Sequence, residues 1–119
     1  MATQYVDLTD EGVKYDPPTL SPSVPPVVKP GDTVIFRVIN IPATYTISWD
    51  NSSPLQNTGS FQVNGSSLTP YSNQEVSTTA SAATYPFTVS PDLPVKSGGP
   101  PEYPEESGGS HGGLEVSPN

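Results

Sequence analysis

The sequence contains no cysteine and few basic side chains. Without cysteine the chain can form no disulfide, no thiolate nucleophile and no thiolate metal ligand. Four basic residues against twelve acidic ones give a formal net charge of -8. A phosphate-binding surface needs clustered Lys and Arg, so the composition predicts no nucleic-acid partner and no anionic membrane partner.

Long apolar runs and helical periodicity are missing as well. No stretch approaches the ~20 apolar residues of a membrane helix. The start of the chain has neither the basic nor the apolar region of a signal peptide, which predicts a cytoplasmic protein or a secreted one whose leader has been removed. Sixteen prolines and ten glycines interrupt every window of helical spacing. At 119 residues we expect a single domain, 1–119.

The sequence does contain short alternating segments separated by turns. The clearest strand is 33–39, which follows the turn at 29–32 and places Val34, Phe36 and Val38 on one face. Other expected strands are 4–8, 13–16, 25–28, 45–50, 61–63, 74–79, 83–89 and 114–116. This pattern predicts an all-β, antiparallel Greek-key sandwich or barrel of about seven or eight strands.

Five segments, taken in order, match the landmarks of a known family. They are 12–17, an opening hairpin that ends in proline; 28–36, a Gly-Asp turn into a core strand; 45–50; 84–92, which reads Thr-Tyr-x-Phe-x-x-x-Pro; and 110–116. Together they resemble the plastocyanin-type cupredoxins. The resemblance implies a cupredoxin-like sandwich over nearly the whole chain. An immunoglobulin-like sandwich, which shares the strand pattern, is the alternative fold.

The resemblance also implies which positions would hold copper. Position by position, Tyr45 stands for the first histidine, Val89 for the cysteine, Asp92 for the second histidine and Ser110 for the axial methionine. A blue-copper site needs two imidazoles and a thiolate in a plane, with a weak thioether above it. None of these ligands is retained. We therefore predict no cofactor and no electron transfer through copper.

Two further groups of residues each allow both a functional and a purely structural interpretation. His111, the single histidine, could form an oxygen-rich metal site with Asp92 and the acids Glu102, Glu105 and Glu106, although a histidine among glycines is typical of a solvated loop. Tyr45 and Trp49 could form an aromatic recognition patch; we interpret Trp49 as a core residue and expect the Tyr45 hydroxyl to reach solvent or a loop carbonyl.

The segment 93–113 is a long Pro/Gly-rich acidic loop with Tyr103 near its centre. Loops longer than ~12–15 residues are usually functional or disordered, so this one is either a contact surface or an unselected insertion. We expect contacts at the end of the sandwich that carries this loop. The candidate binding residues there are Tyr45, Asp92, Tyr103 and His111.

Catalytic motifs are not found. The histidine has no serine elbow motif, and the glycine pairs lack the helix and lysine of a phosphate cradle. The sequence therefore predicts a non-catalytic, copper-free binding or structural module that contacts another protein, as a monomer or weak oligomer. One alternative is a small-ligand or carbohydrate binder that uses exposed Tyr45, Tyr71 and Tyr103. Another is a divalent-metal protein that uses Asp92, His111 and the loop glutamates.

Overall fold

The computed structural model describes residues 3–10, 12–16, 19, 24–91, 93 and 111–117. These residues form nine strands: β1 (Thr3–Thr9), β2 (Gly12–Asp16), β3 (Val27–Val28), β4 (Thr33–Val38), β5 (Thr44–Trp49), β6 (Phe61–Asn64), β7 (Tyr71–Glu75), β8 (Ala83–Ser90) and β9 (His111–Val116). Within the described part of the chain, no helix is long and apolar enough to cross a membrane.

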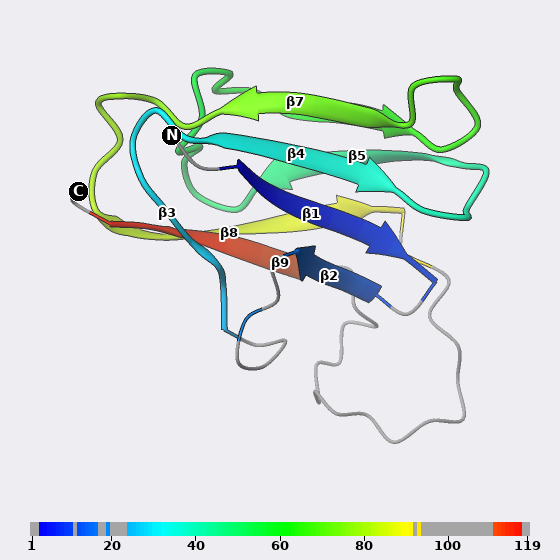
Figure 1. Ribbon diagram of the computed structural model, residues 1–119, viewed down its shortest axis with the longest axis horizontal. Helices are drawn as coiled ribbons and strands as arrows, with labels where there is room; N and C mark the ends of the chain where they lie inside the picture. The colour runs from blue at the N-terminus through cyan, green and yellow to red at the C-terminus, as the bar shows by residue number, and fades with distance from the viewer. Residues whose placement is uncertain are drawn as a thin grey trace.

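The strands form two sheets. One has the order β2-β1-β4-β7 and the other the order β3-β9-β8-β5-β6. In Figure 1 the first sheet runs from β7 through β4 and β1 to β2, with β5 and β8 seen behind it. The all-β prediction is confirmed. The sequence predicted antiparallel sheets, but two pairings, β1 with β4 and β3 with β9, are parallel. Both sheets are therefore mixed.

The core lies between the sheets because apolar residues alternate along the strands. The predicted inward residues Val34, Phe36 and Val38 are all buried, and the residues between them are half-buried on the opposite face. Phe36 is the centre of an aromatic cluster: its ring lies 5.0 Å from Phe61 and 5.7 Å from Phe87, edge to face in both cases. Phe36 belongs to one sheet and its ring partners to the other, so this cluster joins the two layers.

Most strands begin and end within two residues of the predicted bounds, but two strands differ by three residues or more. The strand expected at 74–79 is β7, which ends at Glu75; the backbone then turns, and the Ala80 N–H donates to the Ser77 carbonyl at 3.1 Å. The last strand begins at His111, three residues before the expected start at Leu114. The sequence had placed the two glycines that follow His111 in a loop, because glycine is unfavourable inside strands.

Packing explains why glycine occupies β9. A Cβ added to Gly112 would lie 2.5 Å from Phe87 Cζ and 3.0 Å from Tyr15 Oη, so no side chain fits there. The next residue, Gly113, donates its N–H to Tyr15 Oη at 3.1 Å. Tyr15 belongs to the edge strand β2 of the other sheet, so this hydrogen bond connects the two sheets. Burial of this phenol raises the pKa of Tyr15.

The packing around Gly112 leads to a stability prediction. Gly112→Ala should lower the free energy of unfolding by about 1–3 kcal/mol, because the methyl group overpacks the Phe87 ring. Urea denaturation measures the change. The matched control is Gly59→Ala, where the nearest atom to an added Cβ is Asn57 Oδ1 at 3.8 Å; its unfolding free energy should change by less than about 1 kcal/mol. Equal stabilities of the two variants would contradict this account of β9.

Candidate functional site

The structure brings two of the inferred copper positions to the same end of the five-stranded sheet. Tyr45 lies at the start of β5 and Val89 near the end of β8, and the register pairs Val89 with Ile47. Both side chains point inward, with 3% and 1% of their surfaces exposed, and both belong to the hydrophobic core. The other two inferred positions, Asp92 and Ser110, lie outside the described residues.

This pair does not fit a copper ion. Val89 has no donor atom, and burial in the core raises the pKa of the Tyr45 phenol, which disfavours the phenolate that a metal would bind. The chain has no cysteine to supply the thiolate of a blue-copper centre. We therefore derive no chemical step through copper at these residues.

Tyr45 is buried, whereas the sequence predicted that it is exposed. Its ring packs in the core opposite Val63 of β6 and is nearly inaccessible to solvent, because odd-numbered residues of β5 face the other sheet. Trp49 lies on the same face and is half-buried against Phe36 and Phe87, at centroid distances of 6.5 and 5.3 Å. Among the described residues its buried Nε1 has no hydrogen-bond partner. Both aromatic residues thus have packing roles.

His111 lies on the outer face of the five-stranded sheet and is exposed. It is paired across β8–β9 with Thr88, whose Oγ1 lies 3.4 Å from His111 Nδ1 and donates a 2.7 Å hydrogen bond to Asp50 Oδ1. In the described part of the chain, no three His, Asp or Glu side chains group closely enough to hold a metal ion. The other predicted binding residues, Asp92 and Tyr103, and the acids Glu102, Glu105 and Glu106, lie outside that part.

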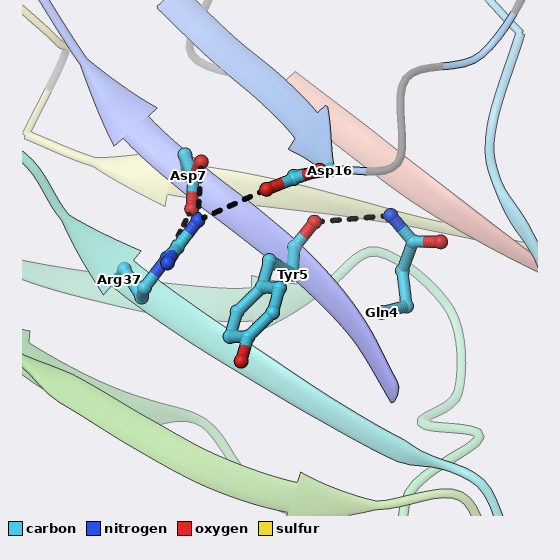
Figure 2. A network of polar contacts seen from close by, with 5 residues as sticks. All are labelled: Gln4, Tyr5, Asp7, Asp16 and Arg37. Carbon is cyan, nitrogen blue, oxygen red and sulfur yellow. Dashed lines mark hydrogen bonds and ion pairs between the residues drawn. The ribbon is translucent and has the colours of Figure 1, made fainter. Parts of the chain in front are cut away.

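A different cluster stands out on the outer face of the four-stranded sheet. Arg37 donates from Nε to Asp7 Oδ1 at 2.7 Å and from Nη2 to Asp7 Oδ2 at 2.9 Å (Figure 2). Its guanidinium carbon lies 3.9 Å from the centroid of the Tyr5 ring, and Nη2 is 3.7 Å from Asp16. The hydrogen bond to Asp7 raises the pKa of Arg37. The bidentate ion pair with Asp7 and the stacked Tyr5 ring hold this guanidinium in one orientation.

The strand register builds the cluster. The parallel pairing of β1 with β4 puts Asp7 beside Arg37, and the antiparallel pairing of β4 with β7 puts Tyr71 on the other side. The Val38 N–H donates to the Pro70 carbonyl at 3.0 Å, so the next pair, Arg37 with Tyr71, is of the non-hydrogen-bonded kind in which side chains approach most closely. We call Tyr5, Arg37 and Tyr71 the Tyr–Arg surface.

The sequence placed Arg37 on the face opposite the core but did not reveal the Tyr–Arg surface. Tyr5 and Arg37 are thirty-two positions apart, and their contact depends on the parallel pairing of β1 with β4, which hairpin signals do not predict. Tyr71 lay outside the expected strands, three residues before the one expected at 74–79. The structure places it in β7 with 48% of its surface exposed.

Comparisons with known proteins show the fold. No family model and no curated protein matches the chain. A crystal structure of a multicopper oxidase is similar, with a TM-score of 0.50 and 16% sequence identity over 98% of this chain. The multicopper oxidase mgLAC is 14% identical over 99% of this chain, with a TM-score of 0.45.

Multicopper oxidases have cupredoxin-like domains, so the expected cupredoxin-like fold is confirmed. This chain covers 42% and 38% of the two solved chains and is therefore less than half as long as either.

The ion pair in the Tyr–Arg surface can be tested by substitution. Arg37→Ala should lower the unfolding free energy by about 1–3 kcal/mol, because it leaves the Asp7 carboxylate without its bidentate partner. The Asp7 side chain is 11% exposed, so water replaces that partner poorly.

The double variant Asp7→Asn with Arg37→Ala is the control. Arg37→Ala leaves the Asp7 carboxylate charged and without its partner, and Asp7→Asn removes that charge. The double variant should therefore recover part of the lost stability in the same denaturation measurement. A double variant no more stable than Arg37→Ala alone would show that the pair is not energetically coupled.

Proposed function

We propose that the chain is a non-catalytic, copper-free binding domain that acts by contact with another protein through the Tyr–Arg surface. The observation that carries this proposal is the Arg37 guanidinium fixed over the Tyr5 ring on an outer sheet face, with Tyr71 as the register partner of Arg37 on the next strand. The face lies away from the core, so the rings and the guanidinium can be covered by a partner without any change of fold.

The residue types of this surface favour protein contact. Tyrosine and arginine are enriched among the few residues that dominate protein–protein binding energy. Arg37 is held by Asp7 and by the Tyr5 ring, so little side-chain freedom remains to be lost when a partner binds. The opposite outer face offers Thr46, Thr84 and Thr88 instead and has no comparable aromatic cluster in the described residues.

Charge indicates the chemistry of the partner. Asp7 and Asp16 already offset the positive charge of Arg37, and Glu75 lies on the same sheet face. With a formal net charge of -8, the chain attracts a protein whose contact surface is rimmed by lysine or arginine. The occupant that we propose is such a protein, with an apolar centre that covers Tyr71.

The absence of copper chemistry is part of the same proposal. The solved neighbour is a multicopper oxidase, but this chain is less than half as long. At the two described positions that the resemblance assigns to ligands, it has the buried pair Tyr45 and Val89. Packed side chains at this end support a domain that binds and does not oxidise. Of the three tyrosines considered for a carbohydrate site, Tyr71 is exposed, Tyr45 is buried, and Tyr103 lies outside the described residues.

Affinity capture with matched variants tests the proposal. Immobilised wild-type chain is incubated with extract of its own cells, and each captured protein is quantified by mass spectrometry. The specific partner should be captured roughly tenfold less by Tyr71→Ala, because truncating a central aromatic anchor removes a large share of interface energy. Capture should fall in high salt, which screens the acidic surface.

The matched control is Thr84→Ala, an exposed residue on the opposite outer face. It should capture the partner as the wild type does. A protein captured equally by wild type and Tyr71→Ala does not use the Tyr–Arg surface, and if every captured protein behaves so, the proposal is wrong.

A further inference from the structure

We propose that two copies of the chain associate by pairing their β6 strands edge to edge. β6 (Phe61–Asn64) is the last strand of the five-stranded sheet and is hydrogen-bonded to β5 on its other side. Antiparallel pairing of two such edges joins two five-stranded sheets into one continuous sheet. The proposal does not rest on the Tyr–Arg surface, which belongs to the other sheet.

The backbone of β6 has hydrogen-bonding groups that point outward. The Gly65 N–H donates to the Ala43 carbonyl at 2.7 Å, and this bond sets the alternation along the pair: residues 61, 63 and 65 bond to β5. Gln62 and Asn64 therefore direct their backbone groups away from β5. The Asn64 carbonyl accepts the Ser67 N–H at 3.1 Å, but no described residue bonds to the backbone of Gln62.

Two of the other edge strands carry protection against such pairing. β2 has two exposed charged side chains, Lys14 and Asp16, and charge on an edge disfavours the approach of another strand. β3 is two residues long and follows Pro25 and Pro26, which lack backbone donors. Neither edge is suited to pairing with a second copy.

One end of the β7 edge is covered by its own chain. The Gln56 N–H donates to the Glu75 carbonyl at 2.9 Å, and the Ser77 N–H donates to the Pro54 carbonyl at 2.8 Å. These bonds cover the end of β7, and Glu75 adds a charge. β6, which reads Phe-Gln-Val-Asn, has no charge and no proline, and among the described residues the backbone of Gln62 on its outward edge has no hydrogen-bond partner. It is the least protected of the four edges.

Charge makes a second copy a suitable occupant at this edge. Like charges repel two chains of net charge -8 over most of their surfaces, but the sequence has no charged residue between Asp50 and Glu75. β6 lies inside that uncharged stretch. A two-fold axis beside Gln62 makes the contact self-complementary: the N–H of Gln62 donates to the carbonyl of Gln62 of the second copy, and the reverse bond forms as well.

Sedimentation velocity over a series of concentrations of the purified chain tests the proposal. The wild type should pass from monomer to dimer as concentration rises. Gln62→Lys places two like charges directly opposite each other, so the dimer dissociation constant should rise roughly tenfold at low salt. Added salt should restore much of the association because it screens that repulsion. Gln62 is exposed, so the variant should stay folded, which circular dichroism verifies.

Two control variants are matched to this test. Gln62→Thr keeps the backbone and adds no charge, so it should dimerise as the wild type does. Asn73→Lys adds the same charge to the edge strand β7 and should also dimerise normally. A wild type that stays monomeric at the highest concentration overturns the proposal, as does equal weakening by Gln62→Lys and Asn73→Lys. Dimerisation lost in Tyr71→Ala but kept in Gln62→Lys would place the contact on the Tyr–Arg surface and would likewise overturn it.

Discussion

The packing of Phe36 against the facing sheet is the interaction on which the rest of the structure depends. Its ring is fully buried and meets Trp49, Phe61 and Phe87 edge to face, so one residue of the four-stranded sheet contacts three strands of the other. Edge-to-face pairs contribute about 0.5–1.5 kcal/mol each beyond the area that they bury. With no cysteine for a disulfide, apolar contacts hold the layers together, and this aromatic cluster lies within that core.

The same close packing determines which side chains fit at β9 and at the positions of Tyr45 and Val89. Phe87 approaches β9 so closely that only glycine fits at position 112, and Tyr15 bonds to the neighbouring amide. At the two described positions that the resemblance assigns to copper ligands, the core continues through Tyr45 and Val89. We therefore propose that the contacts of this domain lie on the outside of the sandwich, on the Tyr–Arg surface and at the edge of β6.

Much of the fold could be predicted from the sequence because local signals specify it. Alternation located the strand around Phe36 and its inward face, and the order of motifs indicated a cupredoxin-like sandwich, which the structural neighbours support. Local signals do not specify pairing between distant strands. The parallel contact of β1 with β4 was therefore missed, and with it the cluster around Arg37. The start of β9 was missed because its glycines serve a long-range contact with Phe87.

The candidate site was less predictable than the fold. Position-by-position comparison located Tyr45 and Val89 at one end of the sheet, but the exposure of Tyr45 depends on the side of the strand that it occupies, and Tyr45 faces the core. Tyr71 was named as a possible binding residue and is exposed, yet its neighbour Arg37 was not recognised as part of the same surface. Single candidate residues could thus be named from the sequence, whereas the residues that lie beside each of them depend on the strand register.

We propose that the chain binds no copper, because packed side chains occupy the two described positions, Tyr45 and Val89, that the resemblance assigns to ligands. The most direct test is a thermal unfolding measurement of the purified chain with and without Cu(II), because a ligand that binds the native state raises the unfolding midpoint with concentration. The account predicts an unchanged midpoint and no intense visible absorption. A midpoint that rises with Cu(II), and that no longer rises when Tyr45 is replaced by Phe, would contradict it.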